Sequence, residues 1–196
     1  MTNRTTLVAR LKEEYDTRIA KELQDELGCS NIHEVPKITS IILDMCCGKA
    51  LKSNKDFKLE RNKEDLHRIS FQKPLTIKAK KSIAAFSLRR GMDISLKVTL
   101  RGKKMYLFLD RFINIACVQN NEFNGFNIDS INKNNNKGFS YCYGLKDISI
   151  FPEIKKISLT DYVGMGISIH TNCKNKESLE LLLNKFRFPF IKKGGK

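Results

Sequence analysis

The chain has 196 residues, of which 41% are hydrophobic and 29% are charged, a length and composition typical of one globular domain with a buried core. Its apolar runs are only a few residues long, which predicts no membrane-spanning helix, and acidic residues near the N-terminus predict no cleaved targeting segment. The formal net charge of +15 predicts a polyanionic partner. Nucleic acid is the first choice, and the alternatives are an anionic membrane surface or a basic face that is only solvated.

The first part of the chain predicts two helices and two strands. Apolar residues recur every four positions from Leu7 to Leu27, the period of an amphipathic helix that ends near Gly28. Residues 38–45 are rich in β-branched side chains and predict a mostly buried strand. The charged stretch 49–68 predicts a helix toward its end, and residues 75–78 predict a short strand.

The second part predicts further strands and two helices. After a basic loop near 78–91, apolar residues of 94–100 alternate with polar and basic residues, so one sheet face is apolar and the opposite face is open to a ligand. Residues 105–116 and 179–186 have the spacing of amphipathic helices, and 139–143 and 163–169 alternate as strands do. The asparagine-rich segment near 131–138 predicts a loop.

These elements predict one domain over residues 1–196 with an α+β fold. An antiparallel or mixed sheet would carry helices on one face and a basic RNA-binding face on the other. Positive charge is concentrated in the middle of the chain, because residues 49–104 hold 17 basic and five acidic residues, whereas residues 1–48 hold six basic and eight acidic. The basic face is therefore expected around this middle segment.

The cysteines and histidines predict neither a metal site nor a catalytic centre. No Cys-x-x-Cys pair occurs, and no histidine stands at ligand spacing from a cysteine pair. His33, His67 and His170 are scattered, without a nucleophile motif beside them. We therefore expect no catalytic residue, metal or cofactor, and we interpret the six cysteines as reduced, small hydrophobic residues: Cys29, Cys46, Cys47, Cys117, Cys142 and Cys173.

Six short motifs occur in one order along the chain and carry a more specific signal. They are FQKP at 71–74, KAKKSIA at 78–84, KVTLRGKKMY at 97–106, FLDR at 108–111, IFPEI at 150–154 and FPF at 188–190. Together they resemble the bacterial-type large-subunit ribosomal protein number five, the 5S-rRNA-binding protein of the central protuberance. The resemblance runs from about residue 11 to residue 190.

The resemblance implies a structural, non-enzymatic role in translation. Proteins of that family dock their sheet on 5S rRNA and help to join it to the large-subunit rRNA, beside neighbouring large-subunit proteins. Their basic loop approaches the elbow of P-site tRNA, and they bridge to a protein of the small-subunit head. For this chain, the resemblance implies rRNA contacts by Asp44, Gln72, Lys73, Lys97, Thr99 and Arg101. It implies tRNA contacts by Lys78, Lys80, Lys81, Ser82, Arg89 and Arg90.

The chain also departs from the family pattern. Asp44 stands where the family usually has asparagine, and an acid facing phosphate is unfavourable without a compensating donor or cation. Phe71 replaces the glycine of Ser-Gly-Gln-Lys-Pro, residues 119–125 replace a basic stretch, and residues 132–138 replace Phe-Asp-Gly-Arg-Gly-Asn near the small-subunit bridge. With the Asn, Lys and Ile bias, this drift favours an organelle-encoded protein of the mitochondrial matrix over the bacterial cytoplasm or the plastid stroma.

Two other functions are compatible with parts of the pattern. A stand-alone, sheet-based RNA-binding regulator would stack bases on exposed aromatic residues, for which the chain offers Phe139, Tyr141 and Tyr143, although a core role is typical of such a strand. An RNA-modifying enzyme would need a metal motif, a cofactor loop or a paired acid and base, and the sequence has none of these.

Overall fold

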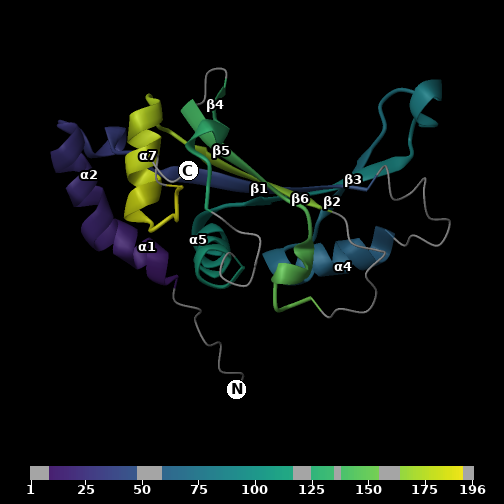
Figure 1. The fold of residues 1–196 in the computed structure, drawn as a ribbon, viewed down its shortest axis with the longest axis horizontal. Coiled ribbons are helices and arrows are strands. Elements are labelled where there is room, and N and C mark those ends of the chain that lie inside the picture. Colours follow the sequence, from purple (N-terminus) through teal and green to yellow (C-terminus); the bar gives the residue numbers. More distant parts are fainter. Residues whose placement is uncertain (1–8, 48–58, 117–124, 135–137, 155–163, 192–196) are drawn as a thin grey trace.

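The computed structural model describes residues 9–47, 59–116, 125–134, 138–154 and 164–191 (Figure 1). The helices are α1 (Arg10–Glu14), α2 (Ala20–Leu27), α4 (Leu59–Ser70), α5 (Gly102–Arg111) and α7 (Lys176–Lys185). The strands are β1 (Ile38–Cys46), β2 (Leu75–Lys78), β3 (Asp93–Leu100), β4 (Ile131–Asn134), β5 (Gly138–Leu145) and β6 (Met165–Thr171). Within these ranges, every helix is too short or too polar to cross a membrane.

One six-stranded sheet organises the fold, in the order β2-β3-β1-β6-β5-β4. Each neighbouring pair of strands is antiparallel. Strand β1 is central and joins residues far apart in sequence, since Leu43 lies between Val98 of β3 and Ile167 of β6. The prediction of an α+β fold with an antiparallel sheet is confirmed, and β2 and β4 are the sheet edges.

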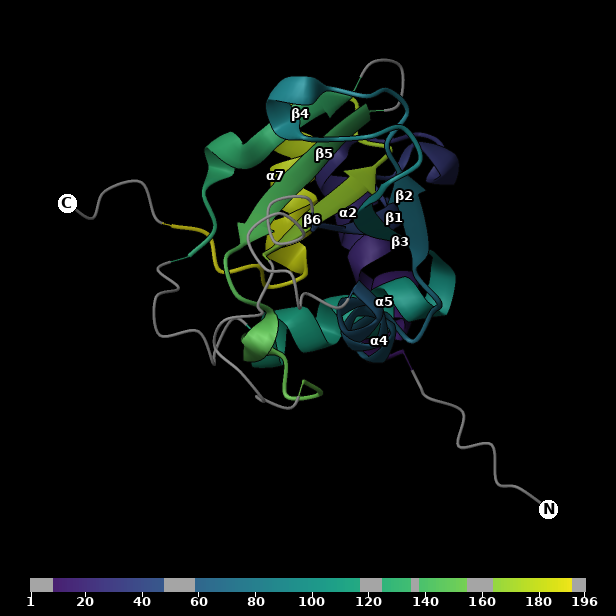
Figure 2. The same cartoon turned by 90° about the vertical axis from the view of Figure 1, so that its right-hand side faces the viewer.

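The helices cover one face of this sheet. Figures 1 and 2 show α4 and α5 side by side beneath the strands, with α7 and the helix formed by α1 and α2 packed at the end where β1 begins. Side chains alternate along each strand, so Ile41, Leu43 and Met45 of β1 point into the core and are fully buried. Leu109 and Phe112, predicted to lie in the core, are buried against them.

The N-terminal helix is confirmed from Arg10 to Leu27, with a local irregularity, and its predicted start at Leu7 lies outside the described residues. A π-helical turn at Tyr15–Ile19 joins α1 to α2, and the hydroxyl of Thr17 donates to the carbonyl oxygen of Glu13 at 2.7 Å. The helix ends at Gly28, whose φ of 61° is left-handed, the conformation that glycine adopts most readily at a helix C-terminus. The helix packs through Leu11, Ile19 and Leu23, as its four-residue period predicts.

Two segments that the sequence predicts as loops are more ordered than expected. Residues 131–134 form β4 and pair with β5, with Asn132 opposite Ser140; residues 135–137 lie outside the described residues. Residues 79–92 form an extended hairpin in which Ile83 and Leu88 exchange backbone hydrogen bonds of 2.9 and 3.1 Å. Cross-strand pairing therefore overrides the loop-like composition of both segments. Residues 49–58, Cys117 and Val163 also lie outside the described residues.

Candidate nucleic-acid interface

The open face of the sheet carries small polar side chains. Register and alternation place Asp44 of β1, Lys97 and Thr99 of β3, and Ser168 of β6 on this face, since Asp44 pairs with Lys97 and Ile42 pairs with Thr99 and Ser168. The same rule adds Ser140, Cys142 and Gly144 of β5 and Gly166 and His170 of β6. Apart from Lys97 and His170 these side chains are short, and Ser140 is itself buried, so an RNA backbone could approach the strands closely.

Asp44 is held by its neighbour on β3. The hydroxyl of Ser95 donates to Oδ1 of Asp44 at 2.5 Å and is also 3.0 Å from the carbonyl oxygen of Met45. Lys97 is directly opposite Asp44 in the register, so one cation and one anion stand side by side at the centre of the open face. The strands of this face are thus polar and nearly neutral, rather than strongly basic.

Gln72 and Arg101 flank the end of β3. The side-chain amide of Gln72 donates to the carbonyl oxygen of Thr99 at 3.3 Å, which fixes the loop before β2 against β3. Arg101 follows β3, is exposed, and precedes the first turn of α5. The structure therefore brings together five of the six residues predicted to contact rRNA: Asp44, Gln72, Lys97, Thr99 and Arg101.

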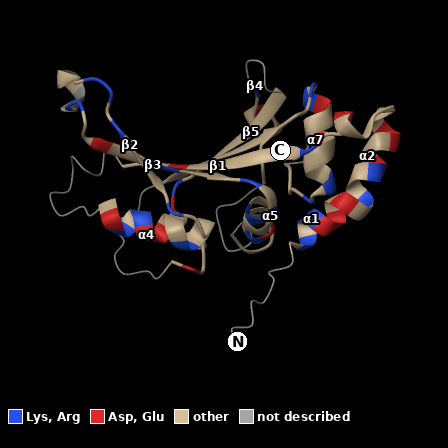
Figure 3. Ribbon diagram, turned by 180° about the vertical axis from the view of Figure 1, so that it is seen from behind, with Lys and Arg blue, Asp and Glu red and all other residues tan. Residues whose placement is uncertain are grey.

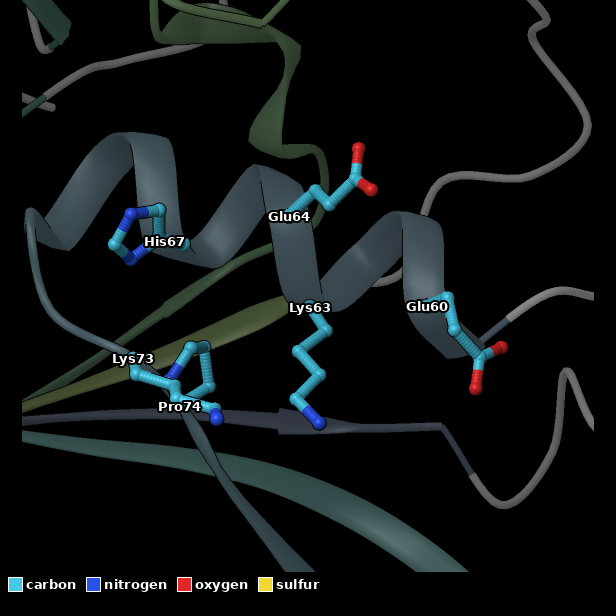
Figure 4. Close-up of a pocket in the computed structure, with 6 residues that line it drawn as sticks. All are labelled: Glu60, Lys63, Glu64, His67, Lys73 and Pro74. Carbon is cyan, nitrogen blue, oxygen red and sulfur yellow. The ribbon is translucent and has the colours of Figure 1, made fainter.

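Lys73 is separate from these five. It lines a pocket beside α4 (Figure 4). The lining residues are Glu60, Lys63, Glu64, His67, Lys73 and Pro74. Figure 4 shows Lys73 beside Pro74, on the side of α4 that carries Lys63 and His67, while the carboxylates of Glu60 and Glu64 point away from it.

The basic hairpin, residues 78–91, is the most strongly charged part of the structure. Its cations are Lys78, Lys80, Lys81, Arg89 and Arg90, called here the hairpin cations, and all five side chains are exposed. Figure 1 shows the hairpin extending beyond the sheet, away from the helices. Ser82, predicted to contact tRNA, accepts a hydrogen bond from the backbone N–H of Arg90 at 3.0 Å, so its hydroxyl helps to hold the two arms together.

The cations at the opposite end of the molecule have protein partners. They are Arg10, Arg18, Lys185 and Arg187, called here the paired cations, and they bind the carboxylates of Asp110, Glu14, Glu22 and Glu26 at 2.5–3.7 Å. Hydrogen bonds from Lys185 to Glu26 and Glu22 raise the pKa of its ammonium group, and the bond from Lys185 lowers the pKa of Glu22.

The hairpin cations have no such partners. Across the described ranges, none of them, nor Lys97, Arg101 or Lys103, forms an ion pair with a carboxylate. Figure 3 shows the contrast, with blue segments on the hairpin and mixed red and blue segments on α1, α2 and α7. Clustered cations without carboxylates are the surface that a polyanion stabilises.

The aromatic residues proposed for base stacking lie on the other face. Tyr141 is fully buried, and Phe139 and Tyr143 are partly buried against the core. The rings of Phe126 and Tyr143 are 4.9 Å apart at 82°, an edge-to-face contact inside the helix-covered layer. The core interpretation of these residues is confirmed, so they are not a stacking platform on the open face.

The described cysteines are unpaired thiols. Cys29, Cys46, Cys47, Cys142 and Cys173 are free thiols, and burial raises the pKa of the Cys47 thiol to about 11, which keeps it protonated and unreactive at neutral pH. Within the part of the chain that the structure describes, no group of three or more His, Cys, Asp or Glu side chains could hold a metal ion.

Sequence reasoning missed the contribution of β5 and β6 to the open face. Ser140, Cys142 and Ser168 join Thr99 there only because β1 and β6 bring distant segments into register. Their alternation with Tyr141 and Ile169 is a local signal that could have placed them opposite the core. Ser95 was recognised as polar, but its bond to Asp44 depends on the pairing of β1 with β3.

An α+β protein with a polar open sheet and a projecting cationic hairpin has the build of a nucleic-acid-binding protein. Comparisons of the sequence identify the family. Residues 31–89 match the family "Ribosomal protein L5", and residues 93–190 match the C-terminus of the same ribosomal protein family.

Similar proteins cover nearly the whole chain. It is 44% identical over 185 residues to the large ribosomal subunit protein uL5 of Mesoplasma florum, covering 94% of this chain and 99% of that relative. It is 40% identical to uL5 of Ralstonia pickettii, with 94% and 99% covered, and 42% identical to uL5 of Moorella thermoacetica, with 93% and 98% covered. The chain belongs to the ribosomal protein L5 family, whose members are structural ribosomal proteins and not enzymes.

Proposed function

We propose that this chain is a structural constituent of the large ribosomal subunit that binds 5S rRNA and large-subunit rRNA in the central protuberance. The basic hairpin would contact P-site tRNA, and the chain would bridge to the small-subunit head during translation. The observation that carries this proposal is the contrast in charge pairing: the hairpin cations project from the sheet without carboxylate partners among the described residues. Long flexible cations suit phosphate contacts, which need no base edge.

The open sheet face supports the rRNA part of the proposal. Serine and threonine hydroxyls can bond riboses, 2′-hydroxyls and base edges, and Lys97 and Arg101 can neutralise phosphates. Asp44 fits such a surface because Ser95 already donates to it and Lys97 stands opposite.

The stand-alone regulator remains the competing function. Its main requirement was a row of exposed aromatic residues on the sheet, and Phe139, Tyr141 and Tyr143 pack on the covered face instead. The open face and the hairpin would still bind RNA in such a protein. The two functions differ in the particle that the chain stably joins: a ribosomal protein associates with the large ribosomal subunit, and a stand-alone regulator does not.

The compartment of the ribosome is a further part of the proposal. The asparagine, lysine and isoleucine bias supports an organelle ribosome of the mitochondrial matrix, with the plastid stroma as a second organelle. The relatives reported above are bacterial, which favours the bacterial cytoplasm as the competing compartment. Separating the organelles before the sedimentation experiment described in the next paragraph would distinguish these compartments.

Sedimentation of a lysate in high salt tests the proposal. We expect the chain to comigrate with the large ribosomal subunit and with 5S rRNA, because high salt removes proteins held only by weak phosphate contacts. Sedimentation as a free protein, or with messenger RNA alone, would contradict the ribosomal role and support the regulator.

Two variants distinguish the RNA contacts of the sheet from those of the hairpin. Replacing Lys97 and Arg101 with alanine should weaken binding to isolated 5S rRNA, while replacing Lys80, Lys81, Arg89 and Arg90 should leave that binding near wild type. The hairpin variant should instead lose its crosslink to tRNA in assembled ribosomes. Equal effects of both variants on both RNAs would contradict the division of labour between sheet and hairpin.

A further inference from the structure

Phe71 occupies a backbone conformation that rarely suits an aromatic residue. It directly follows α4, and its φ of 51° lies in the left-handed region. Its backbone N–H donates to the carbonyl oxygen of His67 at 2.8 Å, so it stands at the C-terminal capping position that glycine usually fills. A side chain there meets steric strain, which persists only where surrounding contacts fix the conformation.

Two contacts with α5 fix Phe71. Nζ of Lys104 donates to the carbonyl oxygen of Phe71 at 3.0 Å. The guanidinium carbon of Arg111 lies 4.5 Å from the centre of the Phe71 ring, a cation–π contact. Arg111 is itself held by the carbonyl oxygen of Ile69 at 2.7 Å and by an ion pair with Glu153. The ring is therefore positioned before any partner arrives.

The ring nevertheless remains accessible. Phe71 is 51% exposed, and of the aromatic side chains that the structure describes it is the only exposed one. The others, such as Tyr141 and Phe126, are buried or partly buried in the core. Burial of the ring would favour folding, so a fixed but exposed ring in a strained conformation points to a binding partner.

The charges around Phe71 select the kind of partner. Lys104 is in contact with it, Lys103 precedes Lys104 in the first turn of α5, and both are exposed. The bond from Gln72 to Thr99 fixes the same loop beside the end of β3, where exposed Arg101 follows. Glu153 is linked to Phe71 only through Arg111, which neutralises the Glu153 carboxylate in an ion pair. An apolar ring among unpaired cations fits an unpaired nucleobase flanked by phosphates.

We propose that Phe71 is a stacking platform for one unpaired nucleobase of the bound RNA, with Lys103 and Arg101 placed to hold the neighbouring phosphates. The inference rests on the proposed rRNA-binding function and adds to it a contact made through a base. One ring face is covered by Arg111, so the base stacks on the remaining exposed surface. Stacking is tolerant of sequence because every base has a π-face.

Affinity for protein-free rRNA, 5S rRNA together with large-subunit rRNA extracted from source ribosomes, tests the proposal. Phe71→Leu keeps an apolar side chain but removes the π-face, and should raise Kd about 5- to 150-fold, the range for loss of one base stack. Phe71→Tyr should retain wild-type affinity. Phe139→Leu, the same type of change on the covered face, is the matched control and should leave Kd unchanged once folding is verified.

A glycine variant separates binding from folding. Phe71→Gly suits the left-handed conformation, so the variant should fold at least as readily as the other variants while binding rRNA as weakly as Phe71→Leu. Wild-type affinity in both Phe71→Leu and Phe71→Gly would overturn the stacking role and leave the proposed function intact. Failure of the wild-type chain to bind the rRNA would overturn both.

Ultraviolet crosslinking of intact large subunits gives an independent readout. The peptide that contains Phe71 should carry a nucleotide adduct at that residue. A crosslink from Phe71 to a neighbouring protein would overturn the proposal and identify the ring as a protein contact. Nucleotide adducts elsewhere in the chain but none at Phe71 would also overturn it.

Discussion

The end of the molecule formed by α1, α2 and α7 and the basic hairpin at the other end both carry clustered cations, but they differ in what surrounds them. The paired cations bind carboxylates at 2.5–3.7 Å, and Arg18 and Lys185 each bind two of them, Arg18 within its own helix and Lys185 between helices. The hairpin cations have no carboxylate partner among the described residues. The same residue types therefore join helices at one end and present a surface for a polyanion at the other.

The comparison shows that net charge alone does not locate an RNA-binding surface. A cation that already bonds a carboxylate gains less from a phosphate, because the existing bond must be broken or shared. A cation without a carboxylate gains the full interaction and releases the counterions condensed on the RNA. The difference between the two ends leads to the predictions below.

The largest expected effect is on stability, from a residue of the core on which both ends depend. Leu109 of α5 is fully buried. Leu109→Ala should lower the free energy of unfolding by about 2–5 kcal/mol, through lost burial and the cavity left behind. Denaturant titration followed by circular dichroism measures it, and full stability of the variant would show that the assigned core is wrong.

A smaller effect is expected at the centre of the open face. Asp44→Asn removes a negative charge and keeps an acceptor for the Ser95 hydroxyl, so affinity for 5S rRNA should rise by about 1 kcal/mol, the scale of one exposed charge interaction. Filter binding at fixed salt measures the change, with Glu13→Gln on the exposed surface of α1 as a charge-matched control. Weaker binding of Asp44→Asn would mean that the carboxylate itself accepts a bond from the RNA.

The smallest effect is expected at the paired end, and it concerns pH. The pKa of Glu22 is lowered by its bond from Lys185, so this pair stabilises the fold above the carboxylate's ordinary pKa, and the contribution is lost as the pH falls through the lowered value. Lys185→Ala should therefore reduce the thermal midpoint slightly at neutral pH and have no effect at strongly acidic pH. An equal reduction at both pH values would indicate lost packing in place of the ion pair.

Local patterns in the sequence predicted much of the fold. The alternation of 94–100 places Lys97 and Thr99 opposite the core, and the four-residue periods define the N-terminal helix and α5. These patterns were predictable because each depends only on residues close together along the chain. Strand β4 escaped prediction, since asparagine has a low strand propensity and pairing with β5 outweighs it. The contacts of Gln72 and Ser82 depend on partners whose geometry no spacing fixes.

The candidate site was predicted only in part, because some of its features are local in sequence and others depend on tertiary contacts. Motif residues indicated the hairpin and β3, whereas the neutral character of the open face, with Asp44 bonded to Ser95 opposite Lys97, follows from strand register. The pairing of Lys185 with Glu22 and Glu26 is likewise a tertiary property, because these partners lie on another helix. The pairs of Arg18 with Glu14 and Glu22 are local, since they have the i,i+4 spacing of one helix.

The most direct test compares the salt dependence of tRNA binding in two variants that lose the same charge. One replaces Lys80, Lys81, Arg89 and Arg90 with alanine, and the other replaces the four paired cations. Each phosphate contact contributes about 0.7–0.9 to the slope of log K against log salt, so the hairpin variant should lose about 3 of that slope. The paired-cation variant should keep the wild-type slope. An equal loss in both variants, or an unchanged slope in the hairpin variant, would contradict the account.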